Sequence, residues 1–288
     1  MTDVATELDR DLPLDSHVHT DLSPDSDVAI DLYCAEAVAR GIPEIAVTDH
    51  VDFDSRDPAY RYADFATRER VVREAAERWA DRGVSVRFGV ELTYGKPYEE
   101  EIRDHLAHHR YDYAIGSVHD WPDSPYRDRA SFPAWVAGRS IADIVEPYFA
   151  EVIAAARSGL FDTIGHLDVV KRYLTPSVTP TDLDDAPELY EPVLEALIES
   201  GTALEVNTSG LRQEVRETYP SRAIVARYRE LGGERVTVGS DSHRIQHFAY
   251  GLGEGYRIVE GTGFRALSFR RGAGRVEIEL PREAVRWS

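Results

Sequence analysis

The sequence predicts an α/β fold, a closed barrel in which seven strands alternate with helices. The first observation is that apolar runs rich in β-branched residues alternate with helical patterns along the chain, which is typical of a parallel sheet covered by helices. The second is that residues of the types that bind metal ions end nearly every apolar run. Seven such units within 288 residues favour a closed barrel over an open, doubly wound sheet. We expect one domain over residues 1–288, with residues 1–11 as a short polar tail.

The predicted strands follow one another at intervals that leave room for helices. The first is short and lies near residues 12–17, and the others cover residues 45–50, 84–92, 113–119, 161–168, 203–209 and 235–243. Helical patterns stand between them, for example over residues 28–41 and 64–83, where Gly83 is the expected C-cap. A last apolar run, residues 275–280, is predicted as an extra strand.

The polar residues that end the strands predict a site at one mouth of the barrel. In order, they are His17, His19, His50, Glu91, His119, His166, Asp241 and His243. The carboxyl ends of barrel strands meet at one mouth, so these residues become neighbours although they are far apart in the sequence. His17 and His19 lie two positions apart on a strand and point to the same face, so both can reach one ion. Asp25, six residues past His19, adds a carboxylate.

Imidazole and carboxylate groups in this number suit divalent metal ions. Such ligands favour zinc, manganese or iron, and an open catalytic site has three or four protein ligands for each ion. Nine groups therefore suffice for two or three ions, and two ions about 3.5–4 Å apart can assist a phosphoryl displacement. The alternative, that each histidine is an ordinary buried side chain, does not explain six of them at matching strand ends. Three more histidines, His105, His108 and His109, belong to an acidic helix that we interpret as a solvated face.

The composition narrows the classes of partner. A formal net charge of −19 disfavours duplex nucleic acid, whose phosphates need a basic surface. Lys96 and Lys171 are the only lysines, and an acidic, lysine-poor composition is typical of proteins from salt-loaded cytoplasms, with arginine-biased codons as the alternative. No apolar run reaches the length of a membrane helix and the start lacks a signal-peptide pattern, so we expect a cytoplasmic protein without a membrane partner. Cys34 is expected to be a buried apolar residue. The oligomeric state is not predicted.

The motifs that carry these residues resemble the PHP superfamily, named for polymerase and histidinol phosphatase. In chain order they read DSHVHTDLSPDS, TDH, GVEL, GSVH, GHLD, LEVNTSGLR and GSDSH. The first and the last are specific to the superfamily, whereas LEVNTSGLR followed by ETYPS indicates its histidinol-phosphate phosphatases. The resemblance implies a distorted, TIM-like (β/α)7 barrel with a trinuclear metal site at the C-terminal ends of the strands.

The resemblance also implies a role for individual residues. The first ion would take His17, His19, Glu91 and Asp241, the second Glu91, His119 and His166, and the third Asp25, His50 and His243. Arg172 would contact the phosphate as a catalytic group, with its neighbour Lys171 as the alternative, and Asn207 and Arg212 would contact the substrate. The implied reaction hydrolyses L-histidinol phosphate, a small phosphorylated substrate, to L-histidinol and phosphate in histidine biosynthesis.

One segment departs from the family pattern and leaves the substrate open. Residues 120–135 form a predicted long loop with five charged residues and two tryptophans, and an acidic group there could hold a cationic amine such as that of histidinol. A PHP phosphoesterase for nucleotides or short oligonucleotides is a second candidate function, which would need a basic track with aromatic residues. A metal-dependent amidohydrolase is a third candidate, and a non-catalytic metal-binding module is a fourth.

Overall fold

The computed structural model describes residues 12–122, 124–125, 128–271 and 274–280. Its centre is a parallel sheet built from β1 (Asp15–Val18), β2 (Glu44–Val47), β3 (His50–Val51), β4 (Ser85–Thr93), β5 (Tyr113–Ser117), β6 (Thr163–Ile164), β7 (Ala203–Asn207) and β8 (Val236–Gly239). The strand order is β1-β2-β4-β5-β6-β7-β8, and β3 pairs with β4 beside this path. The predicted tail, residues 1–11, lies outside the described residues.

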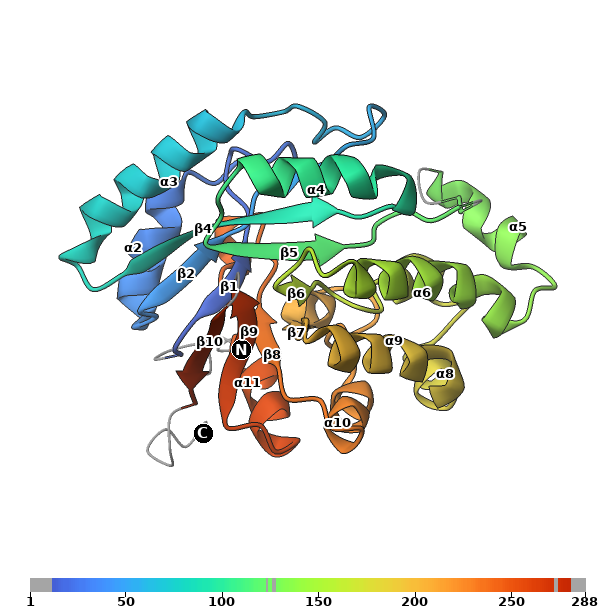
Figure 1. Ribbon diagram of the computed structural model, residues 1–288. Coiled ribbons are helices and arrows are strands. Elements are labelled where there is room, and N and C mark those ends of the chain that lie inside the picture. The colour runs from blue at the N-terminus through green and yellow to red at the C-terminus, as the bar shows by residue number, and fades with distance from the viewer. Residues whose placement is uncertain (1–11, 123, 126–127, 272–273, 281–288) are drawn as a thin grey trace.

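Helices cover the outside of this sheet, as Figure 1 shows. They are α2 (Ile30–Arg40), α3 (Phe65–Ala80), α4 (Glu99–His108), α5 (Phe132–Val136), α6 (Ile141–Ser158), α7 (Val170–Leu174), α8 (Pro180–Asp184), α9 (Pro187–Ser200), α10 (Arg222–Glu230) and α11 (Leu252–Gly261). Short 3-10 helices lie at η1 (Lys96–Tyr98), η2 (Arg129–Ser131), η3 (Thr208–Arg212) and η4 (Ile245–His247). In the described part of the chain, no helix has both the length and the apolar character needed to cross a membrane.

Helix α3 illustrates how the sequence builds these elements. Asp64 caps its start, since the side chain accepts a hydrogen bond from the backbone N of Thr67 at 2.9 Å. Val72 and Trp79, seven residues apart, are both buried on the face that packs against the sheet. The helix ends at Ala80 with Asp81 as its C-cap, so the prediction of Gly83 as the cap was wrong. Gly83 instead lies in the turn that follows, at a φ of 83°.

The barrel closes between its first and last strands. Val18 pairs in parallel with Ser242, the backbone N of His19 donates to the carbonyl of Ser242 at 2.8 Å, and the backbone N of Asp241 donates to the carbonyl of His17 at the same distance. The predicted closed barrel of parallel strands is therefore confirmed. It is distorted where the predicted strand 45–50 divides into β2 and β3, because the backbone N of Thr48 turns to the carbonyl of Val18.

Two segments differ from a simple barrel. The predicted extra strand at 275–280 corresponds to β10 (Gly274–Glu279), which forms an antiparallel hairpin with β9 (Ala266–Arg271), a strand that the sequence analysis missed. The predicted loop at 120–135 contains η2 and most of α5, so it is partly helical. Trp121 and Phe132 of this segment are buried in the hydrophobic core, which anchors it beside the mouth of the barrel.

Candidate metal centre

The carboxyl ends of the strands bring together all nine predicted ligand residues. His17 belongs to β1 and His19 follows it, His50 starts β3, and Glu91 lies near the end of β4. The others stand in the segments that directly follow a strand: His119 after β5, His166 after β6, and Asp241 and His243 after β8. The site therefore depends on closure of the barrel, since its residues come from the first strand, the last strand and those between them.

The first group of side chains consists of His17, His19, Glu91 and Asp241. The Nε2 atoms of His17 and His19 lie 3.0 Å apart, and each lies 3.3 Å from Oε2 of Glu91. Oδ1 of Asp241 lies 3.9 Å from Nε2 of His17 and 3.6 Å from Nε2 of His19. The two imidazoles and Glu91 are buried, so four potential ligand atoms face one point below the surface.

The second group shares Glu91 with the first. Oε1 of Glu91 lies 2.9 Å from Nε2 of His166 and 3.5 Å from Nε2 of His119. The two oxygens of this one carboxylate thus face different sets of imidazoles. A carboxylate in that position can bridge two ions.

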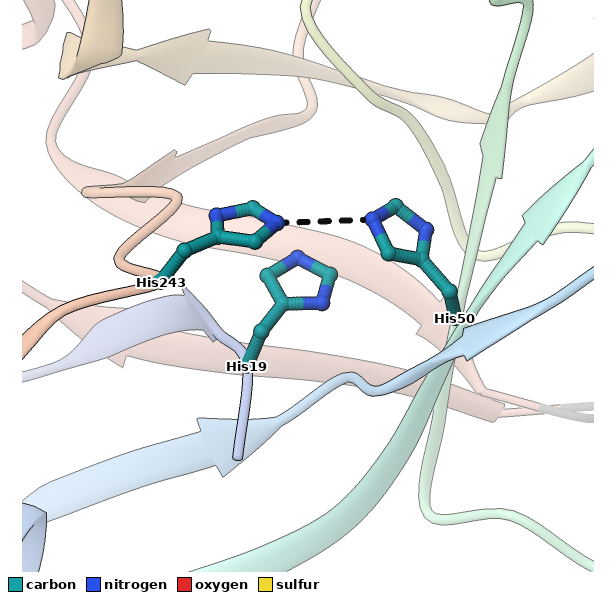
Figure 2. Close-up of side chains that lie close together, drawn as sticks. All are labelled: His19, His50 and His243. Carbon is teal, nitrogen blue, oxygen red and sulfur yellow. Dashed lines mark hydrogen bonds between the residues drawn. The ribbon is translucent and has the colours of Figure 1, made fainter. Parts of the chain in front are cut away.

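The third group consists of Asp25, His50 and His243, from the first, second and last units of the barrel. Oδ2 of Asp25 lies 3.1 Å from Nε2 of His243 and 3.5 Å from Nε2 of His50. Figure 2 shows the rings of His50 and His243 converging, with their Nε2 atoms 3.4 Å apart, and the ring of His19 beside them. His19 stacks on both rings, with centroid separations of 4.3 Å to His50 and 4.0 Å to His243, so it connects this group to the first.

These distances suit small divalent ions. Two ligand atoms at about 2.0–2.2 Å from a tetrahedral ion lie about 3.3–3.6 Å from each other. The closest pairs within the three groups span 2.9–3.5 Å, close to that spacing. Imidazole nitrogens and carboxylate oxygens are also the donors that such ions prefer. The residues present therefore fit metal ions.

The charges within the site are strongly perturbed by burial and by one another. Burial lowers the pKa of His17, but the Glu205 and Glu91 carboxylates outweigh it and raise the pKa well above its usual value. Burial and the neighbouring imidazoles lower the pKa of His19 well below its usual value. Burial raises the pKa of Glu91, yet the imidazoles around it, His50 first, hold the pKa far below normal. The shared carboxylate is therefore ionised and ready to bind a cation.

The chain matches the PHP domain family over residues 15–209. It belongs to this PHP family. It is 30% identical over 265 residues to a probable histidinol-phosphatase of Deinococcus radiodurans, covering 89% of this chain and 96% of the relative. It is also 25% identical to a histidinol-phosphatase of Lactococcus lactis. That alignment covers 88% of this chain and 93% of the relative.

The fold of this PHP protein also has a solved counterpart. The crystal structure of histidinol phosphate phosphatase from Lactococcus lactis, complexed with zinc, L-histidinol and phosphate, superposes with a TM-score of 0.77 at 22% identity. The match covers 92% of this chain and 98% of that one. It supports the assignment of the distorted seven-stranded barrel.

The two adjacent residues that were predicted to contact the phosphate, Lys171 and Arg172, differ in whether they face the ligand groups. Arg172, on α7, lines a cavity of about 310 Å³ together with Glu91, His119 and Asp241. Lys171 does not line that cavity: its side chain is buried, and Nζ pairs with Asp168 Oδ2 at 2.7 Å and with Glu217. Of the two adjacent basic residues, Arg172 is therefore the one beside the ligand groups.

Asn207 and Arg212 lie behind the site. Nδ2 of Asn207 donates to Oε2 of Glu205 at 3.0 Å and to Oδ2 of Asp241 at 3.4 Å. The guanidinium of Arg212 donates to the backbone carbonyls of Ser240 at 2.7 Å and Asp241 at 2.6 Å. In this arrangement both residues hold Asp241, and neither lines the 310 Å³ cavity. Their contact with the substrate stays a prediction.

Sequence reasoning missed two buried carboxylates that support the ligand groups. Oε1 of Glu205, on β7, lies 2.7 Å from Nδ1 of His17. Asp49 accepts hydrogen bonds from the backbone N of Thr20 at 2.6 Å and from Oγ of Ser23 at 3.2 Å. The signal in the sequence was an acidic residue inside an apolar strand, as in ALEVN, which is uncommon unless the carboxylate has a partner.

A second cavity of about 290 Å³ adjoins the first, since both are lined by Asp57, Thr93 and His119. Carboxylates dominate its wall: Asp52, Asp54, Asp57, Asp120 and Glu151. Among the described residues, Arg56 is the only arginine or lysine that lines it, and this guanidinium is paired with Asp54 at 2.6 Å. Tyr94, Tyr98 and Trp121 supply aromatic surface. The cavity therefore suits a cationic group with an apolar body.

Proposed function

We propose that this PHP protein is a metal-dependent phosphomonoesterase that hydrolyses L-histidinol phosphate to L-histidinol and phosphate, a step of histidine biosynthesis. The observation that carries the proposal is the convergence of imidazoles on Glu91, whose carboxylate is shared by two potential metal-binding groups, with a third group of imidazoles beside them. Relatives that are named histidinol-phosphatase and that align over nearly the whole chain support the choice of substrate.

The proposal assigns one divalent ion to each of the three groups. His17, His19, Glu91 and Asp241 would hold the first, Glu91, His119 and His166 the second, and Asp25, His50 and His243 the third. Zinc, manganese and iron all fit imidazole and carboxylate donors. When bound, such ions supply positive charge for the phosphate oxygens and lower the pKa of water.

Arg172 would bind the phosphate from the side of the cavity that α7 forms. Its position among the residues lining the 310 Å³ cavity supports this role, because a guanidinium can make two parallel hydrogen bonds to phosphate oxygens. Asn207 and Arg212 would keep the Asp241 carboxylate aimed at the ligand groups through the hydrogen bonds described above. The ester oxygen would then face the second cavity.

The second cavity would hold the histidinol part of the substrate. Its aromatic side chains can pack on an imidazole ring, and its carboxylates can attract the protonated amine. Asp57 has a central place in this proposal, since it lines both cavities and so lies between the phosphate and the amine. A nucleotide would place a further negative charge or a neutral base against the same carboxylates, which is less favourable.

A cytoplasmic location is part of the same proposal. The one cysteine, Cys34, is buried and free, which fits a reducing compartment.

Release of inorganic phosphate from a small substrate panel tests the function. We expect kcat/KM for L-histidinol phosphate to exceed that for AMP and glycerol phosphate by at least about tenfold, with activity lost on chelation and restored by zinc or manganese. Equal or faster hydrolysis of nucleotides, or hydrolysis that survives removal of all metal, would refute it.

A variant of Asp57 tests the amine pocket separately. Asp57→Asn keeps the hydrogen-bond acceptor that the backbone N of Ala59 uses at 2.8 Å but removes the charge. It should raise KM for L-histidinol phosphate and leave KM unchanged for 3-(imidazol-4-yl)propyl phosphate, which differs only in lacking the amine. Asp81→Asn is the matched control, because Asp81 is exposed at the end of α3 and lines neither cavity. The same change in KM for both substrates would contradict the assignment.

A further inference from the structure

Glu205 is a fully buried carboxylate that belongs to none of the three ligand groups, yet it contacts residues of two of them. Oε1 lies 2.7 Å from Nδ1 of His17, in the first group. Oε2 accepts a hydrogen bond from the backbone N of His166, in the second group, at 2.8 Å. Oε2 also accepts from Nδ2 of Asn207 at 3.0 Å. Two oxygens thus serve three donors from three different segments.

The contact with His17 determines which ring nitrogen is available to an ion. A carboxylate only accepts hydrogen bonds, so when the His17 ring carries a single proton, as a metal ligand must, that proton lies on Nδ1, toward Glu205. Nε2 then has the lone pair that an ion would bind, and this atom faces the first group, 3.0 Å from Nε2 of His19 and 3.3 Å from Oε2 of Glu91. The opposite tautomer would present a proton to the ion instead of a ligand atom.

The contact with His166 holds an unusual backbone conformation. His166 has a φ of 23°, in a region that residues other than glycine rarely adopt. The hydrogen bond from its backbone N to Glu205 stabilises this turn directly after β6. The turn places the imidazole so that Nε2 lies 2.9 Å from Oε1 of Glu91.

The neighbouring strand leaves space for this contact. A Cβ atom at Gly239, on β8, would lie 2.4 Å from Cβ of His17 and 2.8 Å from Oε1 of Glu205. Both separations are too short for real atoms, so any side chain at this position would push the imidazole and the carboxylate apart. Glycine at position 239 therefore permits the pair.

We propose that Glu205 is a positioning residue that couples two of the metal groups, by fixing the His17 ring in the Nδ1–H tautomer and the His166 backbone in its turn. The proposal rests on the metal-binding role of these groups and not on the identity of the substrate. Glutamine is the informative replacement because it has one acceptor oxygen instead of two. If that oxygen serves His17, the amide NH₂ faces the N–H groups of His166 and Asn207; if the amide is flipped, its NH₂ faces His17.

Metal affinity is the first measurement. Competition with a zinc chelator should give an affinity about 10–100-fold lower for Glu205→Gln, as removal of a hydrogen-bond partner behind a ligating histidine does elsewhere. Glu44→Gln is the matched control: Glu44 starts β2 at the far end of a barrel strand and pairs with Arg87, so zinc affinity should be unchanged. An unchanged affinity in Glu205→Gln would overturn the proposal, and no phosphorylated substrate enters the experiment.

The tautomer of His17 in the unmodified, zinc-loaded protein is the second measurement, and it does not depend on whether the variant folds. Nitrogen-15 NMR of the imidazole rings should show a slowly exchanging proton on Nδ1 of His17 and zinc coordination at Nε2. A purely structural role for Glu205 would not require that tautomer. A proton on Nε2, or coordination through Nδ1, would overturn the proposal even if the phosphatase assay succeeds.

Discussion

Oε1 of Glu91 lies 2.9 Å from Nε2 of His166. The other oxygen, Oε2, lies 3.3 Å from Nε2 of both His17 and His19 and 3.1 Å from Nδ1 of His50. One buried carboxylate is therefore within reach of imidazoles from β1, β3 and the segment after β6. Glu91 thus belongs to two potential metal-binding groups, one with His17 and His19 and one with His119 and His166.

This position predicts that Glu91→Gln removes more metal than Asp25→Asn. A neutral amide cannot balance the charge of two ions, whereas Asp25 contacts only the third group and its side chain is half exposed. Metal analysis after gel filtration should show at least two ions lost from Glu91→Gln and at most one from Asp25→Asn. A full metal complement with activity retained in Glu91→Gln would contradict the shared role.

Arg172→Lys should lose activity although the charge is kept. Lysine cannot copy the planar fork of a guanidinium, and a charge-assisted hydrogen bond contributes about 1.5–3 kcal/mol, so kcat/KM should fall by about 10–100-fold. Metal content should stay the same, because Arg172 lines the cavity without belonging to a ligand group. Unchanged kinetics in this variant would mean that the phosphate is held by other groups.

Lys171→Met should destabilise the fold. It would leave Asp168 and Glu217 without the buried ammonium that pairs with both, and breaking a buried ion pair from one side costs about 3–5 kcal/mol. Arg227→Met is the control, since Arg227 pairs with Glu191 and Glu230 in a more exposed setting, where solvent screens the pairs and the loss should be much smaller. The free energy of unfolding in urea distinguishes the two. Equal losses would show that the buried ammonium contributes little.

Zinc binding should release protons at neutral pH. Burial lowers the pKa of His50, but Glu91 and Asp25 outweigh it and raise the pKa from 6.5 to about 9. Below that pH an ion must displace a proton from the ring, so apparent zinc affinity should rise with pH up to about 9. The stability of the metal-free fold has the opposite dependence on pH. The protonated His50 imidazole contributes its full stabilisation below pH 6.5, and this contribution is lost as the pH rises through about 9.

Calorimetry at pH 7.5 in two buffers with different enthalpies of ionisation measures the protons released for each zinc ion bound. A value of zero, together with a zinc affinity that does not change with pH, would contradict the protonation of His50 in the metal-free protein.

If the excess of acidic residues is an adaptation to salt, Tm should rise from low to molar KCl. At a net charge of −19, screening relieves the repulsion among carboxylates. A Tm that is flat or falls with KCl would leave arginine-biased codons as the explanation for the composition.

The sequence predicted the fold and the convergence of the ligands because both follow from local patterns. Alternating strands and helices indicate a barrel, and barrel geometry alone then brings His17 and Asp241 together from opposite ends of the chain. Cys34 was correctly predicted as a buried residue from its helical context.

The sequence could not predict the side-chain contacts that form across the barrel, because these depend on the tertiary structure. In the sequence, Glu205 is one residue of an apolar strand without an evident partner. Only the tertiary structure brings its carboxylate to His17. Lys171 and Arg172 are adjacent in sequence, yet a short helix turns one into the protein and the other toward the cavity. The sequence predicts His109 on a solvated face, but the centroid of its ring lies 4.4 Å from that of Phe65, because the C-cap of α4 lies beside the first residue of α3.

Anomalous diffraction from crystals grown with zinc tests the central claim most directly. We predict three zinc peaks at the mouth of the barrel, with protein ligand atoms about 2.0–2.2 Å from each ion. Glu91 should contact two ions, and Asp25, His50 and His243 should surround the third. Peaks at other histidines, such as His105 and His109, or a Glu91 carboxylate that contacts no ion, would contradict it.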